Sequence, residues 1–495
     1  MHSIRMNGLC ILLMCLSLKL SAQKQVVVAG VLDPGVAYDT IILHVIPLYA
    51  FHSADIYNQS NVVKSFSAVP VNGRFRIEFT GADHPVYIKV YRSAKREDFF
   101  NLLLDSASTG LLMVSPGDSL HISFHKQNRV YSGVGAAKNN CMAELSALVD
   151  TARSPKGVVA LSPEFFAYEN ASLKAQMNIL NKYRSLMTRP EAEQLEADII
   201  GDATMSRFAY HFRDLDSKQL EYYKQVLRRI PVSQLNTPAA INSRSFASGI
   251  YRQVLTNYYY DTLIHATPAK DLYTHFTQNF TGLLRDRLVT CLLKAMSAKS
   301  NFSETDTRDA LTYVQHPESR TLLESQYHTY RKGSPVINFV FRDSLNRPVQ
   351  LSDLKGRVVL IDMWFTGCGG CVQVAKALPK VEELFRDRKD VVFVSISIDR
   401  EIETWKKSIR PEGDKYYPGS TDRYTHYTTA STHYWYTSGQ GTNNDFIQTY
   451  VPGGSYPHLL LLDKRGRVYS AAPPRPDVDA DALVKLINQA ADNSL

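Results

Sequence analysis

The chain has few cysteines, six in 495 residues, and their spacing argues against a structural metal site. Cys368 and Cys371 form a Cys-x-x-Cys motif, but there is no second such motif and no histidine pair at zinc-finger spacing. A structural zinc ion needs four ligands, so this set is incomplete. Val372 rather than a histidine follows the motif, which excludes a c-type haem attachment. The histidines of the middle region are too scattered to suggest any other metal centre.

The sequence also lacks a strong excess of charge of one sign. Its 56 basic and 48 acidic residues leave a net charge of +8, and the two kinds are interleaved along the chain. Such a pattern is typical of a solvated surface and does not favour nucleic-acid binding. Beyond the N-terminus, no apolar run approaches the ~20 residues that a membrane-spanning helix needs. We therefore expect no nucleic-acid partner and no stable insertion into a membrane.

The first 22 residues have the pattern of a signal peptide. Arg5 precedes an almost wholly apolar stretch from Gly8 to Leu18, and Ala22 supplies a small residue for cleavage. The apolar stretch has about half the ~20 residues of a spanning helix, so a cleaved segment is favoured over an anchor. The sequence thus predicts export, with residues 1–22 removed.

The Cys-Gly-Gly-Cys motif itself predicts a redox dithiol. It lies between an apolar, strand-like run, Val358 to Phe365, and a helix-like segment, Val372 to Leu378. Cys368 and Cys371 are one helical turn apart, so a disulfide can close between their sulfurs. The N-terminus of the helix would stabilise a thiolate on Cys368.

Two further cysteines remain after the predicted cleavage, Cys141 and Cys291, both in helical-looking sequence. They are interpreted as small buried hydrophobic residues. A structural disulfide between them is the alternative in an oxidising compartment.

Several segments around the motif occur in an order that resembles the thioredoxin superfamily, and within it the TlpA-like, periplasmic thiol-disulfide oxidoreductases. The resemblance covers residues 333–492 and implies an α/β thioredoxin-like domain, a mixed sheet flanked by helices. It is carried by an entry strand and turn (333–339, 349–356), Asp362, a second strand (391–399), Trp405, Tyr456-Pro457, a third strand (458–463) and Gly466.

The resemblance also implies roles for individual residues. Cys368 would attack a partner's disulfide, and Cys371 would resolve the mixed disulfide. Asp362 would lie in a dry environment that raises its pKa, so that it could exchange a proton with Cys371; the alternative is a buried carboxylate without a catalytic role. A cis Pro457 would bring the backbone of Tyr456 beside Cys368 to pair with an extended substrate.

Trp364 completes the residues expected to bind the substrate. The redox-active disulfide is the expected reactive group, and no other cofactor is expected. The resemblance places the protein in the periplasm. Its expected partners are exported proteins that contain disulfides and a membrane thiol electron donor.

The chain departs from the resemblance in three places. Gly369-Gly370 stands where many members have Gly-Pro, which makes the first helical turn less rigid. Pro379 comes eight residues after Cys371 rather than five. A long polar stretch, 410–454, carries many tyrosines and predicts either an irregular loop over the active site or an ordered helical insertion.

Upstream, the patterning predicts two more regions. Residues 24–135 contain segments rich in β-branched and aromatic residues, with turn signals at 71–74 and 115–118, and indicate an antiparallel, all-β sandwich. The turn Pro116-Gly117-Asp118-Ser119 resembles the N-terminal domain of many Bacteroidetes TlpA-like proteins. Residues 136–332 have helical periodicity and predict an all-α region; its expected helices include 173–184, 217–229, 272–296 and 304–315.

Two other function classes stay open from the residues alone. A peroxiredoxin-like peroxidase shares the entry segment, but the Pro-x-x-x-Thr-x-x pattern that usually precedes a peroxidatic cysteine is absent before Cys368. The second class is an envelope binding protein in which residues 24–332 hold a partner and the redox domain is auxiliary.

Overall fold

The computed structural model describes most of the chain after residue 23. The described residues are 24–32, 40–46, 48, 64–80, 83–92, 110–125, 128–151, 162–208, 218, 221, 225, 232, 235–262, 269–298, 302–409, 427, 433–451 and 454–492. The predicted signal peptide lies outside them, as does most of the predicted helix 217–229. The chain divides into two compact units, Met1–Leu43 with Phe66–Asn140, and His44–Ser65 with Cys141–Leu495.

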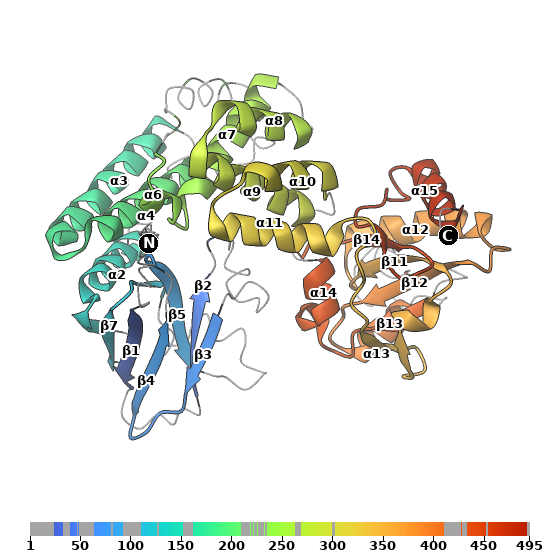
Figure 1. Cartoon of the computed structure of the whole chain (residues 1–495), viewed down its shortest axis with the longest axis horizontal. Helices are drawn as coiled ribbons and strands as arrows, with labels where there is room; N and C mark the ends of the chain where they lie inside the picture. The colour runs from blue at the N-terminus through green and yellow to red at the C-terminus, as the bar shows by residue number, and fades with distance from the viewer. Residues whose placement is uncertain are drawn as a thin grey trace, which may run out of the picture. The chain divides into compact units, whose positions relative to one another are not determined.

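The N-terminal strands form two four-stranded sheets, in the orders β4-β1-β7-β8 and β3-β2-β5-β6 (Figure 1). Alternate residues of β4, among them Phe75, Ile77 and Phe79, are buried, as expected of a strand with one face on a core. The strands are β1 (Gln25–Val31), β2 (Ile41–Ile46), β3 (Lys64–Ala68), β4 (Arg74–Thr80), β5 (Val86–Arg92), β6 (Leu112–Val114), β7 (Ser119–His125) and β8 (Asn128–Val134).

The predicted β-rich domain is therefore present, but the expectation of a wholly antiparallel sandwich is wrong. β1 pairs with β4 antiparallel and with β7 parallel. The turn signal at 71–74 is confirmed, since Asn72 and Gly73 both have positive φ, 51° and 71°. A local turn can be read from its residues, whereas the partner of β1 across the sheet comes from a distant segment.

The middle region is helical, as predicted, with one difference. The expected helix 272–296 is two helices, because Gly282 adopts a φ of +59° and interrupts the backbone. The described helices are α2 (Ala136–Thr151), α3 (Pro163–Tyr183), η4 (Arg184–Leu186), α4 (Arg189–Arg207), α6 (Pro238–Ile241), α7 (Phe246–Thr262), α8 (Ala269–Asn279), α9 (Gly282–Ala298), α10 (Glu304–Tyr313) and α11 (Pro317–Tyr330).

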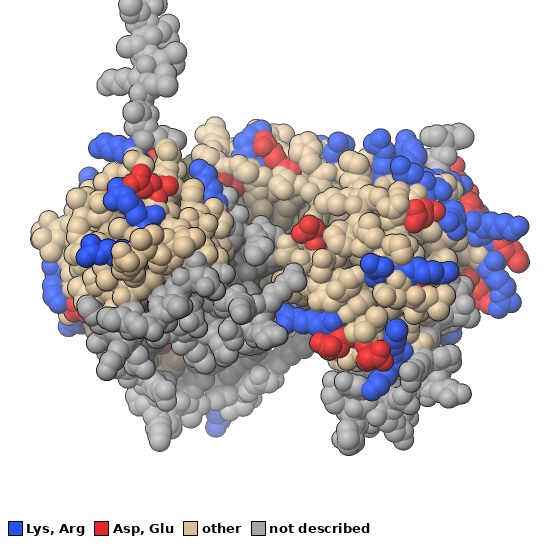
Figure 2. Space-filling model, turned by 90° about the horizontal axis from the view of Figure 1, so that it is seen from below, with Lys and Arg blue, Asp and Glu red and all other residues tan. Residues whose placement is uncertain are grey.

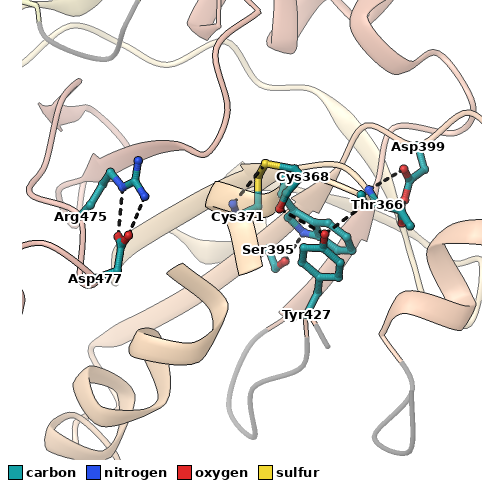
Figure 3. Close-up of a disulfide and its surroundings, with 10 residues drawn as sticks. Thr366, Cys368, Cys371, Ser395, Asp399, Tyr427, Arg475 and Asp477 are labelled. Atoms are coloured by element: carbon teal, nitrogen blue, oxygen red, sulfur yellow. Dashed lines mark hydrogen bonds and ion pairs between the residues drawn. A yellow bond between two sulfur atoms is a disulfide. The ribbon is translucent and has the colours of Figure 1, made fainter. Parts of the chain in front are cut away.

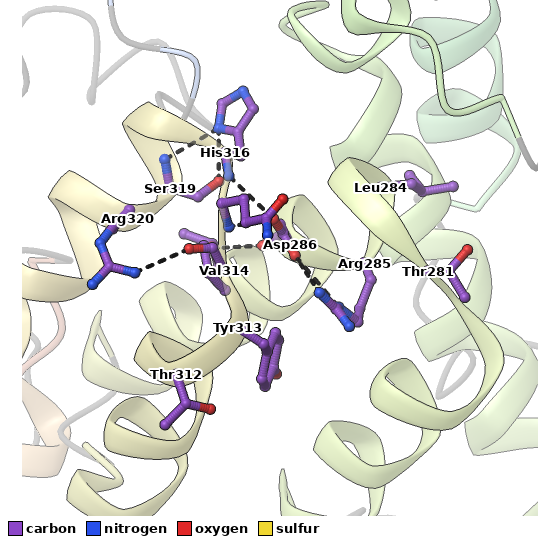
Figure 4. A network of polar contacts seen from close by, with 12 residues as sticks. Thr281, Leu284, Arg285, Asp286, Thr312, Tyr313, Val314, His316, Ser319 and Arg320 are labelled. Carbon is purple, nitrogen blue, oxygen red and sulfur yellow. Dashed lines mark hydrogen bonds and ion pairs between the residues drawn. The ribbon is translucent and has the colours of Figure 1, made fainter. Parts of the chain in front are cut away.

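A buried polar network joins α9 to the link between α10 and α11 (Figure 4). The carboxylate of Asp286 accepts hydrogen bonds from the backbone N–H groups of Gln315 and His316, at 2.7 and 3.1 Å, and pairs with Arg285 at 3.0 Å. The Nδ1 of His316 accepts from the backbone N–H of Ser319 and so caps the start of α11. His316 is thus a structural residue of the helical region.

The C-terminal part is built on a seven-stranded mixed sheet, in the order β10-β9-β13-β12-β11-β14-β15. β11 pairs with β12 parallel and with β14 antiparallel. The elements are β9 (Val340–Asp343), β10 (Pro348–Gln350), η6 (Leu351–Leu354), β11 (Val358–Trp364), α12 (Gly369–Leu384), β12 (Val391–Ser397), α13 (Ile402–Ser408), β13 (His433–Tyr436), η8 (Gly441–Asn443), α14 (Asp445–Tyr450), β14 (His458–Leu462), β15 (Val468–Ser470) and α15 (Ala480–Asp492).

Side chains of β11 alternate between two cores. Val359, Ile361 and Met363 lie in the core that also contains residues of α14, and Val358 and Leu360 lie in the core with residues of α12 and α15. This alternation sends Asp362 and Trp364 toward the same side as Val358 and Leu360, the side on which α12 packs. The sheet thereby positions both side chains near the Cys-Gly-Gly-Cys motif.

The polar stretch 410–454 is not one long insertion. Its residues 433–436 form β13, a strand inside the sheet, and Asp445–Tyr450 form α14. Tyr427 is described as well, whereas 410–426 and 428–432 lie outside the described residues. The prediction of a single irregular loop or helical insert is wrong for 433–451, because the aromatic residues of 433–436 favour a strand and β12 and β9 pair with it.

The boundary predicted near residue 332 can be tested by truncation, because Tyr330 packs in a core of the C-terminal sheet. Its hydroxyl donates to the carbonyl of Thr449 at 2.6 Å, and its ring contacts Tyr450 edge-on. We expect a fragment that starts at Gly333 to fold, but to be roughly 3 kcal/mol less stable than one that starts at Pro317, since it loses a buried aromatic ring.

Thermal unfolding of the two fragments measures this difference. Tyr330→Ala in the longer fragment should reproduce the loss and Tyr327→Ala should not, as Tyr327 is outside that core. Equal melting temperatures would show that α11 contributes nothing to the domain.

Candidate active site

A disulfide joins Cys368 and Cys371 at the start of α12 (Figure 3). Cys368 is the N-cap residue of this helix, and its Sγ accepts the backbone N–H of Cys371 at 3.2 Å. Cys368 is 6% exposed and Cys371 is fully buried. The predicted bridge is confirmed, as is the prediction that Cys368 is the more accessible of the two sulfurs.

The peptide bond between Tyr456 and Pro457 is cis, as predicted. Pro457 faces the motif closely: a Cβ added to Gly370 would lie 3.0 Å from the Cδ of Pro457 and 3.8 Å from the carbonyl oxygen of Tyr456. Glycine at position 370 therefore fits this close approach. The ring of Phe365 packs edge-on against Tyr456 and is 37% exposed, which leaves an apolar surface next to the bridge.

Asp362 lies below the surface, 6% exposed, and its Oδ1 has no hydrogen-bond partner in the described part of the chain. Burial raises the pKa of this carboxyl to about 7, although the charge of Arg475 acts to lower it and that of Asp477 to raise it. The raised pKa that the sequence led us to expect is present. A carboxyl with a pKa near neutrality can accept or return a proton at physiological pH.

Arg475 and Asp477 were not anticipated from the sequence. They pair through two hydrogen bonds, from Nε at 3.0 Å and from Nη2 at 2.6 Å. The Nη2 of Arg475 lies 4.0 Å from the position of a Cβ on Gly370, so its charge is next to the motif. No local pattern marked this pair, because it comes from the segment between β15 and α15, about 100 residues after the cysteines.

The loop that leads into Cys368 is held by Asp399, at the end of β12. The carboxylate of Asp399 accepts the backbone N–H of Thr366 at 2.9 Å and the Thr366 hydroxyl at 2.7 Å. It also accepts the hydroxyl of Ser397, and the hydroxyl of Thr366 contacts that of Ser408. These bonds fix the backbone two residues before the nucleophile.

Trp364 is 1% exposed, and its Nε1–H donates to the hydroxyl of Ser395 at 2.6 Å. The ring of Tyr427 stacks on it, with centroids 4.0 Å apart. A contact between Trp364 and substrate stays a prediction, and it would need this ring to be uncovered. In the structure Trp364 packs in one cluster with Cys368 and Cys371, beneath the loop of residues 365–368, which we call the cysteine loop.

Cys141 and Cys291 are unpaired and fully buried. The alternative of a structural disulfide between them is therefore wrong, and the interpretation as buried apolar residues is confirmed. Burial raises the pKa of the Cys141 thiol to about 12 and that of Cys291 to about 11, so both stay protonated and unreactive near neutral pH.

Within the described residues, no group of His, Cys, Asp and Glu side chains is arranged to hold a metal ion. None of the described helices is long and apolar enough to cross a membrane. On the face shown in Figure 2, basic and acidic residues occur side by side, and basic residues are more frequent at its upper right.

A sheet whose central strand leads into a Cys-x-x-Cys disulfide at a helix N-terminus, opposite a cis-proline, defines a thioredoxin-like oxidoreductase domain. Comparison with known proteins agrees. The Redoxin family model matches residues 331–472. The thiol-disulfide oxidoreductase ResA of Bacillus cereus is 29% identical over 137 residues, which cover 28% of this chain and 66% of ResA.

The thioredoxin-like protein YneN of Bacillus subtilis (strain 168) is 26% identical over 150 residues, with 28% of this chain and 74% of YneN covered. Among solved structures, the thioredoxin domain of a thiol-disulfide oxidoreductase from Bacteroides vulgatus is 25% identical, with 32% of this chain and 96% of that chain covered and a TM-score of 0.25. The C-terminal domain has a thioredoxin-like fold and is similar to the Redoxin family and to thiol-disulfide oxidoreductases, in line with the resemblance drawn from the sequence.

Proposed function

We propose that the protein is a periplasmic thiol-disulfide oxidoreductase that reduces or isomerises disulfides of exported proteins through Cys368 and Cys371. One observation carries the proposal: the dithiol is held at a helix N-terminus beside a cis-proline and in a domain with a buried carboxyl of pKa about 7. These parts supply a stabilised thiolate, a place for the substrate backbone and a proton carrier.

The reaction begins with the reduced dithiol. The thiolate of Cys368 attacks one sulfur of the substrate disulfide, and the other substrate sulfur leaves as a thiolate that takes up a proton. Cys371 then loses its proton and attacks the Sγ of Cys368. The substrate is released with both sulfurs reduced, and the two electrons it gained come from the Cys368-Cys371 pair, now a disulfide.

Asp362 handles the proton in the second step. Its carboxylate form accepts the proton of Cys371 as that thiol becomes the attacking group, and its buried position keeps the exchange away from bulk water. The backbone of Tyr456, next to Gly370, offers a carbonyl to an extended segment of the substrate. The exposed ring of Phe365 adds an apolar contact.

The sequence supports the proposed compartment and partners. Residues 1–22 read as an export signal, which places the dithiol where secreted proteins acquire their disulfides. Each turnover that reduces a substrate leaves the Cys368-Cys371 bridge, so a thiol reductant must reduce it again, and we propose a membrane thiol electron donor for this step.

Insulin reduction by the purified mature protein, with dithiothreitol as the electron source, tests the proposed activity. We expect turnover that requires both cysteines. Peroxide consumption without disulfide reduction would favour the peroxidase alternative. Retention of an envelope partner by the Cys368→Ser/Cys371→Ser double variant, in a protein without reductase activity, would favour the binding protein.

A prediction about the leading thiol follows from its N-cap position. The pKa of Cys368 in the reduced protein should lie below the value of about 8.5 for a free thiol, because the N–H groups of the first turn of α12 stabilise the thiolate. Alkylation with iodoacetamide as a function of pH measures it. An unshifted value, or faster alkylation of Cys371, would contradict the assigned roles.

A further inference from the structure

Tyr427 forms hydrogen bonds with the cysteine loop that no sequence motif predicted. It is 3% exposed and lies directly against the loop (Figure 3). Its hydroxyl oxygen accepts the backbone N–H of Gly367 at 3.2 Å and is 3.4 Å from the carbonyl oxygen of Cys368, to which it donates. Burial raises the pKa of this phenol to about 12, so the hydroxyl keeps its proton and can donate at neutral pH.

The backbone of Tyr427 is held as firmly as its side chain. Its N–H donates to the carbonyl of Ser408, in the last turn of α13, at 3.3 Å. The hydroxyl of the same Ser408 lies 2.7 Å from that of Thr366. Ser408 at the end of α13 is therefore linked to the loop through two residues, Thr366 and Tyr427. The ring of Tyr427 also stacks on that of Trp364.

Three consecutive loop residues are thereby fixed by groups outside the loop. Asp399 holds Thr366, and Tyr427 holds both Gly367 and Cys368. Gly367 has a φ of +94°, and a Cβ there would meet nothing within 4 Å, so the space beside it does not restrain it. Glycine has more backbone freedom than any other residue. The hydrogen bond from the Gly367 N–H to the Tyr427 hydroxyl oxygen limits that freedom here.

We propose that Tyr427 is a positioning residue that holds the Cys368 sulfur over the N-terminus of α12 for disulfide exchange. It acts through the backbone of Gly367 and Cys368 and does not touch the sulfur in the contacts observed. The inference rests on the proposed function as far as rate is concerned. The expected effect of Tyr427 on the pKa of the Cys368 thiol does not depend on any substrate.

Tyr427→Phe tests the role, because it keeps the stacked ring and removes the hydroxyl. Freed from its two bonds, the loop should hold Sγ less well against the N–H groups of α12. We expect the pKa of Cys368 to rise measurably toward about 8.5. The rate constant for reduction of oxidised glutathione at pH 7 should fall roughly tenfold, as expected for a misplaced reacting group.

Tyr436→Phe is the matched control. Tyr436 is also buried and also stacks on a tryptophan, Trp405, with centroids 5.0 Å apart. Its hydroxyl donates to the carbonyl of Arg400 at 2.6 Å, in a loop that does not carry the cysteines. The control should lose a similar amount of thermal stability, with the thiol pKa and the exchange rate unchanged.

The outcomes separate the two proposals. A changed pKa in Tyr427→Phe alone supports positioning, whether or not the wild type reduces proteins. If the pKa and rate of Tyr427→Phe equal those of the wild type while its melting temperature falls as in the control, Tyr427 only packs and the inference is overturned. A wild type without exchange activity refutes the proposed function and leaves the pKa comparison valid.

Discussion

Cys371→Ala should stop turnover while it preserves the first chemical step, and the mixed disulfide should accumulate. Cys368 keeps its place as N-cap of α12 and can still attack a disulfide. The resolving sulfur is gone, so release depends on an external thiol. Steady-state insulin reduction should fall by more than about 100-fold, and Cys368→Ala should abolish attack as well.

Non-reducing electrophoresis of cell extracts, followed by identification of the trapped proteins, measures the accumulation. Cys141→Ala serves as a matched control, since it removes a fully buried thiol that lies in α2 and outside the motif's sequence. That control should trap nothing and keep wild-type activity. Trapped complexes in Cys368→Ala/Cys371→Ala, or none in Cys371→Ala, would refute the division of roles between the two cysteines.

Asp362→Asn should have the second large effect. It should slow the release of the mixed disulfide and raise the stability of the folded protein at pH 8. The variant should slow release of the mixed disulfide by roughly 100-fold at pH 7, because no carboxylate remains to take the proton of Cys371. The first attack by Cys368 should change little. Stopped-flow mixing with a substrate disulfide resolves the two steps, and equal slowing of both would instead indicate a structural role.

The stability effect follows from the raised pKa of Asp362, about 7 against an ordinary value of 3.8. Between these values the folded protein binds more protons at this site than the unfolded chain, so stability falls as pH rises. The loss is complete above pH 7 and corresponds to about 4 kcal/mol. Asp362→Asn, which stays neutral, should therefore match the wild type near pH 4 and be more stable at pH 8.

Denaturant unfolding of the oxidised domain at several pH values measures this difference. Asp463→Asn is the matched control: Asp463 is equally buried, 6% exposed, but its carboxylate accepts the backbone N–H groups of Arg465 and Arg467. That substitution should lower stability at neutral pH and leave the exchange rate unchanged. A pH-independent difference between Asp362→Asn and the wild type would contradict the raised pKa.

The order of short segments in the sequence was enough to predict the core of the candidate site. The strand before Cys368 and the helix after Cys371 are local signals, each readable within about ten residues, and the role of the Tyr456-Pro457 pair was implied by the family resemblance. Asp362 could be named as well, because the resemblance implies a buried carboxylate six residues before the first cysteine. The two free cysteines and the helical character of 136–332 were predicted for the same reason, namely the local apolar pattern.

What failed was pairing over long distances. The parallel contact of β1 with β7 and the strand β13 inside the C-terminal sheet depend on partners that local propensity does not encode. The break between α8 and α9 at Gly282 was missed because the apolar pattern continues through it. A single glycine in a helical pattern is often tolerated, and only the fold decides whether it ends the helix.

The cysteine motif alone was enough to predict the chemistry, because exchange with an internal resolving thiol needs two cysteines close enough to form a disulfide, and a helix N-terminus favours the thiolate of the first. The folded chain adds the groups that surround this motif. Asp399, Tyr427 and Arg475 follow Cys368 by about 30 to 100 residues in the sequence. In the folded chain they lie beside the motif and its loop, where a charge or hydrogen bonds act on them. Hydrogen bonds and charges depend on distance in the folded chain, and spacing along the sequence does not reveal that distance.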